Sequence, residues 1–187
     1  MPTASSIIKL LGLKPHKEGG HFAEVWRAPE RLAVNALPPR YSGSRSLSTA
    51  IYYLITPESF SRMHRLRSDE LFHFYLGDPV EFLLLEPEDK GAGRMAQGAG
   101  RKAHGAGQDG NGHVVTVGSD LSAGHRPMLA VRRGAWQGAR LVEGGKYALL
   151  GTTMAPGFEY EDYEEGDRGL LVRGYPAFEK MICALTS

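Results

Sequence analysis

The feature that most constrains the fold is a series of short strand-like segments separated by turn residues. Residues 70–76 and 80–85 are rich in β-forming side chains, and Gly77-Asp78-Pro79 between them is a strong turn signal. Residues 49–55 have the same strand character and end before Pro57. Because such segments follow one another with almost no helical pattern between them, the sequence predicts an antiparallel sandwich or barrel and not a parallel sheet.

The remaining elements extend this pattern at both ends of the chain. A short helix is expected at residues 5–13, where Ser5 or Ser6 can cap the start and Gly12 ends it. Residues 177–185 are expected to form a closing helix. Further strands are expected at residues 21–27, 113–117, 128–132, 147–154 and 158–163.

Length and composition favour one soluble globular domain spanning residues 1–187. The formal net charge is +1, which supplies no field for nucleic acid or an anionic membrane, so neither partner is expected. Cys183 is the only cysteine, so no internal disulfide can form. No apolar run approaches the roughly 20 residues of a membrane helix, and residues 1–13 lack the pattern of a secretory signal. We therefore expect a cytoplasmic protein.

One internal segment departs from the rest in composition. Residues 91–112 hold eight glycines and no β-branched or aromatic residue, so they can bury little apolar surface. We expect residues 87–112 to form a flexible glycine-rich loop inserted between two strands of a single domain.

The most informative polar residues are His64 and Glu70, six positions apart. If Glu70 faces the interior of the barrel, alternation along its strand places Phe72 on the same side. His73 then points the other way and reaches the interior only through a bulge. His73 is therefore a candidate ligand-binding residue, with a structural hydrogen bond or a dimer contact as the alternative.

Five blocks of the sequence form a characteristic series over about residues 10–165, namely residues 13–22, 49–54, 64–78, 134–137 and 155–159. In their content and order these blocks resemble the cupin superfamily, and more specifically its DUF985 (cupin-5) family. The resemblance implies a single-domain cupin β-barrel, the double-stranded β-helix or jelly roll, with a fold like that of the deoxysugar-nucleotide epimerases of the superfamily. It also implies a homodimer, because cupins commonly pair through their edge strands.

A typical cupin binds a divalent metal through two histidines one residue apart, a glutamate and a third histidine from a second motif. Here Leu66 stands at the second histidine position and Gln137 at the third. The pattern therefore offers His64, Glu70 and Gln137 as metal ligands. One imidazole, one carboxylate and a weak amide make a poor divalent site. We expect no required cofactor, with a divalent metal on these three residues as the alternative.

The pair His64 and Glu70 is also a candidate for acid–base catalysis. Burial raises the pKa of a carboxyl group, while a neighbouring imidazole favours its ionised form. The favoured function is a metal-independent or weakly metal-assisted epimerase or isomerase acting on a sugar-like metabolite. Two alternatives stay open, a non-catalytic module that binds a small polar metabolite and a metal-dependent cupin oxygenase. The simplest interpretation of His64 and Glu70 is that they only hydrogen-bond to each other and to neighbouring backbone.

Other residues are candidates for binding the ligand. Tyr52 and Tyr53 are adjacent on one strand, so only one of them can face the interior. Trp136, next to Gln137, is a candidate for stacking on a sugar or base, with core packing as the alternative. Arg27 is a candidate for holding an anionic group, with a surface ion pair as the alternative.

Overall fold

The computed structural model describes residues 2–86 and 111–186, and the structural statements below refer to these residues. Most of the predicted glycine-rich loop lies outside them. Of residues 87–112, the structure describes only Asn111 and Gly112, and Gly112 already belongs to a strand.

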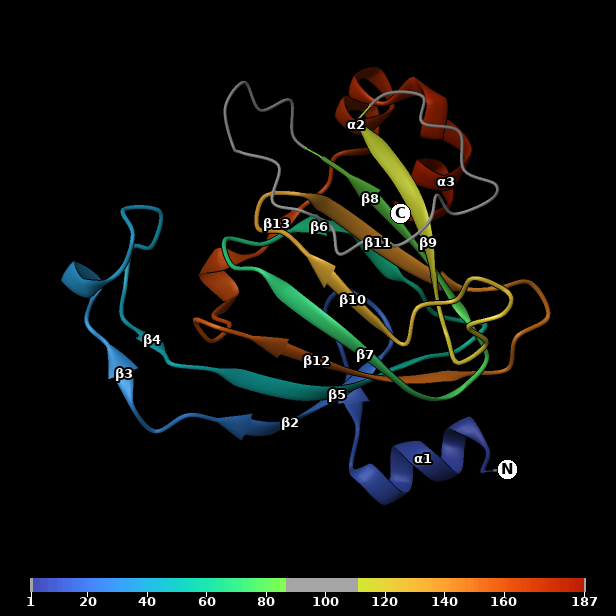
Figure 1. The fold of residues 1–187 in the computed structure, drawn as a ribbon, viewed down its shortest axis with the longest axis horizontal. Coiled ribbons are helices and arrows are strands. Elements are labelled where there is room, and N and C mark those ends of the chain that lie inside the picture. The colour runs from blue at the N-terminus through green and yellow to red at the C-terminus, as the bar shows by residue number, and fades with distance from the viewer. Residues whose placement is uncertain (1, 87–110, 187) are drawn as a thin grey trace.

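Two antiparallel sheets form the body of the protein (Figure 1). The larger sheet has six strands in the order β1-β2-β5-β12-β7-β10, and the smaller has five in the order β13-β6-β11-β8-β9. The strands are β1 (Lys14–Pro15), β2 (His21–Arg27), β3 (Arg31–Leu32), β4 (Arg45–Ser46), β5 (Thr49–Ile55), β6 (Ser61–Arg65), β7 (Glu70–Gly77), β8 (Val80–Leu85), β9 (Gly112–Val117), β10 (Met128–Val131), β11 (Trp136–Leu141), β12 (Ala148–Met154) and β13 (Glu164–Glu165).

The space between the two sheets is filled by the main hydrophobic core. The six-stranded sheet contributes Tyr53 and Phe72, and the five-stranded sheet contributes Phe82 and Leu84, all of them buried. The rings of Phe72 and Phe82 meet at 4.7 Å across this interface. These contacts confirm the predicted all-β architecture, because alternate residues of strands in both sheets point into one shared interior.

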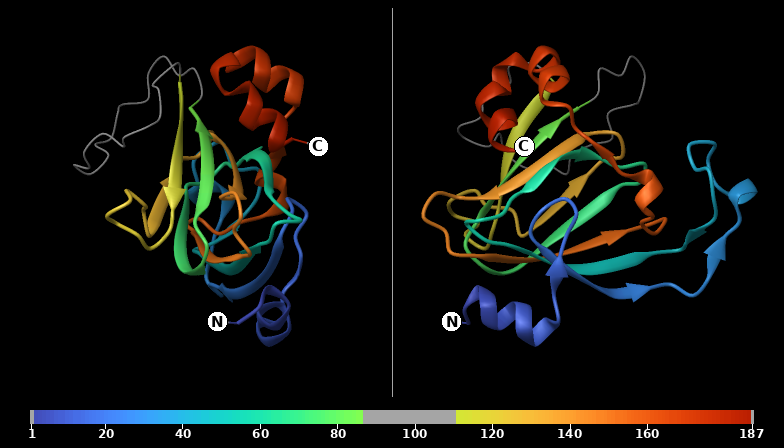
Figure 2. Two further views of the ribbon diagram at one scale, coloured as in Figure 1. Left: turned by 90° about the vertical axis from the view of Figure 1, so that its right-hand side faces the viewer. Right: turned by 180° about the vertical axis from the view of Figure 1, so that it is seen from behind.

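Short helices cover the two outer faces (Figure 2). Helix α1 (Ala4–Leu11) packs on the six-stranded sheet through a small cluster that contains Ile7 and Leu54. Helices α2 (Arg168–Gly174) and α3 (Glu179–Ala184) cover the five-stranded sheet through a cluster that contains Met63 and Ile182. No helix of the described residues is long and apolar enough to cross a membrane.

The N-terminal helix is confirmed, but its cap differs from the prediction. The Thr3 side chain accepts a hydrogen bond from the backbone N–H of Ser6, so Thr3 is the N-cap instead of Ser5 or Ser6. Gly12 ends the helix in the left-handed conformation, at φ 62°, as expected for a glycine at this position.

The prediction of a strand over residues 158–163 is wrong. Residues Tyr160–Asp162 form a 3-10 turn (η2), and only Glu164–Glu165 pair as a strand. The reason is an ion pair that sequence periodicity does not reveal. The carboxylate of Asp162 is buried and accepts two hydrogen bonds from Arg45, at 2.9 and 2.7 Å, which turns the chain inward at this point.

A small arm projects from the barrel between β2 and β5 (Figures 1 and 2). It carries the paired strands β3 and β4 and the 3-10 turn η1 (Val34–Ala36). Arg45, on β4, connects the base of the arm to Asp162. A third 3-10 turn, η3 (Pro176–Phe178), joins α2 to α3.

Candidate functional site

A buried polar cluster bridges the two sheets. His64 and Gln137 are cross-strand partners on β6 and β11 of the five-stranded sheet, and Glu70 begins β7 in the six-stranded sheet. Their exposed fractions are 1%, 2% and 7%. The Nε2 group of Gln137 donates a hydrogen bond to Oε2 of Glu70 at 2.7 Å and lies 3.2 Å from Nε2 of His64. The structure therefore brings together the three residues on which the sequence-based hypothesis depends.

The hydrogen bonds around His64 define its tautomer. Its Nδ1 lies 2.7 Å from the backbone carbonyl of Arg62, and a carbonyl can only accept, so Nδ1 carries the hydrogen. The neutral ring then has a lone pair on Nε2, which accepts from the Gln137 amide. Nε2 therefore faces the carboxyl groups of the cluster and is the atom of His64 that can take up a proton.

The loop between β1 and β2 adds a second carboxyl group. Oε2 of Glu18 lies 3.5 Å from Nε2 of His64, and its side chain is only 13% exposed. The loop reaches β6 of the opposite sheet, where the Arg62 N–H donates to the Glu18 carbonyl at 2.9 Å. Gly19 makes this approach possible. It has φ 104°, and a Cβ atom there would lie 2.0 Å from the Phe60 carbonyl oxygen.

Burial changes the acidity of both carboxyl groups. It raises the pKa of Glu18 from 4.5 to about 8. Burial and the charge of Glu18 raise the pKa of Glu70 to about 7, against the lowering effects of His64, Gln137 and Thr152. Both groups therefore exchange protons near neutral pH, which an exposed glutamate does not do.

Two histidines beside these carboxyls stay neutral. Burial lowers the pKa of His64, against the charges of Glu70 and Glu165 and its backbone hydrogen bond. Burial, followed by the charge of His64, lowers the pKa of His16 to about 4. A neutral imidazole can act as a base, so His64 lies beside two carboxyls with which it is chemically able to exchange protons.

The amide oxygen of Gln137 is buried and has no hydrogen-bond partner among the described residues. A buried acceptor without a donor is uncommon, because the lost hydration costs free energy of about 1–3 kcal/mol. A ligand that carries a hydroxyl or N–H group would satisfy this oxygen. The Gln137 oxygen is therefore an acceptor of the cluster that has no donor among the described residues.

Two tyrosines border the cluster. Tyr163 follows η2 and stacks on the His64 ring at 5.3 Å with an interplanar angle of 27°. Tyr53 faces the interior, as one of the two adjacent tyrosines must, but its hydroxyl donates to the Gly19 carbonyl at 2.9 Å. Tyr53 therefore holds the loop that presents Glu18, and its role as a ligand-binding residue stays a prediction.

Two of the predicted ligand-binding residues lie on the outer face of the six-stranded sheet. Tyr52 packs edge-to-face against Tyr75 at 6.1 Å. His73 pairs through Nε2 with the Thr153 hydroxyl at 3.3 Å, on the side of β7 opposite to Glu70 and Phe72. The structure does not bring either residue into the cluster, because strand alternation turns them outward.

Trp136 and Arg27 are also outside the cluster. Trp136 packs with the hydrophobic residues beneath the C-terminal helices, and the Arg65 guanidinium lies 4.5 Å from its ring centroid. Arg27 binds the carboxylates of Glu24, at 2.8 Å, and Glu159, at 3.1 Å. The alternatives of core packing and an ion pair therefore describe their contacts, and their ligand-binding roles stay predictions.

The donor set does not fit a divalent metal centre. Among the described residues, no group of three or more histidine, cysteine, aspartate or glutamate side chains is arranged to hold a metal ion. The amide N–H₂ of Gln137 points its hydrogens at His64 and Glu70, where a cation would need lone pairs. Leu66 is buried and supplies no donor.

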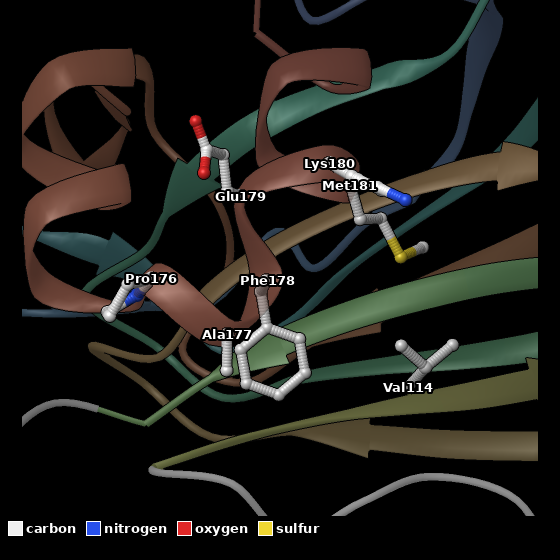
Figure 3. Close-up of a pocket in the computed structure, with 7 residues that line it drawn as sticks. All are labelled: Val114, Pro176, Ala177, Phe178, Glu179, Lys180 and Met181. Atoms are coloured by element: carbon white, nitrogen blue, oxygen red, sulfur yellow. The ribbon is translucent and has the colours of Figure 1, made fainter.

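A separate surface pocket of about 460 Å³ lies where η3 and α3 meet β9 (Figure 3). Its lining includes Val114, Phe178 and Met181, and none of the residues of the buried cluster. The Phe178 ring also packs against the position of Gly112, where a Cβ atom would lie 2.6 Å from it. The pocket is mainly an apolar recess, and Glu179 and Lys180 are the charged residues of its lining.

Sequence reasoning missed three residues of the site, namely His16, Glu18 and Tyr163. A signal existed for the first two, since they flank Lys17 next to the Gly19-Gly20 pair, which marks a special backbone conformation. No local signal identified Tyr163, because its position over His64 follows from the turn that the buried Arg45–Asp162 pair imposes.

Comparisons with known proteins agree with this architecture. The profile of the family described as Cupin superfamily (DUF985) matches residues 5–165. The uncharacterized protein YML079W of Saccharomyces cerevisiae is 26% identical over 157 residues, which cover 79% of this chain and 67% of the yeast protein. A hypothetical protein from Leishmania major is 29% identical, with a TM-score of 0.79 and 99% of both chains covered.

A more distant solved structure is the L-ribose isomerase of Cellulomonas parahominis. It is 14% identical, with a TM-score of 0.52, over 84% of this chain and 81% of the isomerase. At this identity the likeness shows a shared fold alone.

Proposed function

The chain belongs to the DUF985 family of the cupin superfamily, and from this premise we propose that it is an isomerase or epimerase of a sugar-like metabolite. One observation carries the proposal. The lone pair on Nε2 of His64 lies beside two carboxyl groups, Glu18 and Glu70, that burial holds near neutral pKa values. A base and an acid that both work at neutral pH are what a proton shift next to a carbonyl requires.

The proposed reaction needs only proton transfer. Nε2 of His64 removes the proton from the carbon next to the carbonyl, and the protonated Glu70 carboxyl gives its proton to the carbonyl oxygen. The product of this step is an enediol. His64 has become an imidazolium and Glu70 a carboxylate. Reversal on the neighbouring carbon gives an isomer, and return of the proton to the other face gives an epimer.

The remaining groups of the cluster bind and orient the substrate in this proposal. The orphan amide oxygen of Gln137 accepts a hydrogen bond from a substrate hydroxyl. Glu18, protonated at neutral pH, donates a hydrogen bond to a substrate oxygen without adding charge. No metal is needed, because the acid and base replace the Lewis acid in polarising the carbonyl.

A non-catalytic binding module is the second candidate function. It is favoured by the Gln137 amide, which already bridges His64 and Glu70 and so satisfies them without a substrate. The same cluster would then hold a small polar metabolite through the free amide oxygen alone.

Solvent isotope exchange separates the two. Aldoses and ketoses, free and phosphorylated, are incubated with the protein in D₂O, and loss of the proton next to the carbonyl is followed by NMR. We expect exchange with at least one compound, and a loss of about 100-fold or more in His64→Gln and Glu70→Gln. Glu143→Gln removes an exposed carboxylate and serves as the matched control. If compounds bind the wild type and none of them exchanges its proton, the binding module remains.

A further inference from the structure

The surface above the buried cluster carries two cations next to an aromatic ring. The Lys17 ammonium lies 5.9 Å from the centroid of the Tyr163 ring, whose plane also stacks on the His64 ring at 5.3 Å. Arg62 is close enough to Tyr163 for its charge to lower the pKa of the phenol, although burial and the charges of Glu18 and Glu165 raise that pKa overall. Lys17, Arg62 and Tyr163 therefore form one edge of the site, which we name the cationic edge.

The backbone holds the cationic edge together. The Arg62 N–H donates to the Glu18 carbonyl at 2.9 Å, and Nη1 of Arg62 donates to the Lys17 carbonyl at 3.3 Å. The two cations thus come from chain segments that are hydrogen-bonded to each other, one from each sheet. Lys17 lies in the loop between β1 and β2, and these two hydrogen bonds fix the backbone of that loop next to β6.

These two charges are not neutralised within the described part of the chain. No carboxylate there lies within 4.0 Å of the Lys17 ammonium or of the Arg62 guanidinium. The neighbouring Arg65 differs, because Glu164 holds it at 2.7 Å. Glu18 and Glu165 contribute opposing charges near Tyr163, but neither forms an ion pair with Lys17 or Arg62.

The end of the site next to His64 disfavours an anion. It holds two carboxyl groups, Glu18 and Glu70, and no lysine or arginine of the described residues forms an ion pair with either. An anion placed there would be repelled as soon as either carboxyl ionises. The free Gln137 oxygen requires a hydrogen-bond donor, which a hydroxyl group supplies.

We propose that the cationic edge is a subsite for a phosphoryl group, so that the substrate is a phosphorylated polyhydroxy aldehyde or ketone whose neutral end reaches His64. This inference rests on the proposed isomerase function, because that function supplies the reaction of the carbonyl end at His64. A phosphate dianion would pair with the lysine as a point charge and with the guanidinium through directed N–H groups. The phosphate takes no part in the chemistry and holds the carbonyl end in place.

Calorimetric titration with ribose 5-phosphate and with ribose tests the subsite. Ribose 5-phosphate is expected to bind at least tenfold more tightly than ribose, and Lys17→Met or Arg62→Met is expected to remove about tenfold of its affinity. Glu165→Gln is expected to change the affinity in the opposite direction, because it removes the opposing charge. Lys180→Met, which removes an exposed cation next to the separate pocket, is the matched control.

The outcomes for the subsite and for the catalytic proposal are distinguishable. If ribose and its phosphate bind equally, or if the preference survives in the Lys17→Met/Arg62→Met double variant, the subsite is refuted whether or not isotope exchange occurs. If the phosphate binds through these two residues but no compound exchanges its proton, the subsite stands and the isomerase proposal falls. Circular dichroism of each variant confirms that the loss is not caused by unfolding.

Discussion

The buried carboxyl of Glu18 makes a specific prediction about stability and pH. Its pKa is raised from 4.5 in the unfolded chain to about 8 in the folded protein, so the folded state keeps a proton that the unfolded state releases. Where the folded state binds more protons, the free energy of unfolding falls as pH rises. The wild type should therefore lose stability between pH 4.5 and about pH 8 through this group, and Glu18→Gln should not.

The size of the effect follows from the pKa difference. Raising a pKa from 4.5 to about 8 corresponds to about 5 kcal/mol at a pH above both values. The two histidines act in the opposite sense, because their lowered pKa values add stability as pH rises to 6.5. The histidine contributions are present in both proteins and cancel when Glu18→Gln is compared with the wild type, and Glu18 alone accounts for about 2 kcal/mol between pH 6.5 and 8.5.

Urea denaturation at a series of pH values measures this directly. The stability of Glu18→Gln relative to the wild type should rise by about 2 kcal/mol from pH 6.5 to 8.5, while Glu143→Gln, at an exposed site, should show a constant difference. Part of the gain passes through Glu70, whose pKa falls when the charge of Glu18 is removed. A difference between Glu18→Gln and the wild type that does not vary with pH would refute a buried, protonated carboxyl at this position.

Four further predictions follow from other features. Asp162→Asn leaves the buried Arg45 guanidinium without its main counter-charge and should lower the free energy of unfolding by about 3–5 kcal/mol. Glu164→Gln removes an exposed carboxylate and should lower it by less than about 1 kcal/mol. Urea denaturation measures both, and equal losses would contradict the burial of the Arg45–Asp162 pair. Gly19→Ala should destabilise by several kcal/mol more than Gly144→Ala, because both have positive φ but only the former meets a carbonyl oxygen; equal melting temperatures would contradict this geometry. Metal analysis of protein purified without chelator should give well under one divalent ion per chain, and a full equivalent would revive the oxygenase. Light scattering at micromolar concentration should give a dimer of the 20.4 kDa chain, and a monomer would refute that expectation.

The outer face of the six-stranded sheet supports the expectation of a dimer. Its edge regions expose Trp26, Tyr75 and Met128, each at least 50% accessible. Large apolar side chains that gather in one exposed patch are typical of surfaces that pack against another protein. Tyr52 and His73, predicted from the sequence as ligand-binding residues, lie on this same face and would then belong to the subunit contact.

The sequence by itself determined the architecture and two residues of the buried cluster, His64 and Glu70. Alternation of apolar residues and strong turn signals specify antiparallel strands because both depend on short-range backbone chemistry. The same alternation placed Glu70 and Phe72 on one side and His73 on the other, which the structure confirms. His64 was assigned to the same site only from its spacing of six residues before Glu70, which matches the cupin motif.

Only the tertiary structure decided which other groups meet at His64. Glu18 reaches it from a different sheet through a loop that depends on Gly19, and Tyr163 reaches it through a turn set by a pair 117 residues apart, Arg45 and Asp162. Such contacts depend on how the strands are ordered in space, which local periodicity does not encode. The protonation states also came from the fold, since burial and neighbouring charges shift a pKa away from the ordinary value of its residue type.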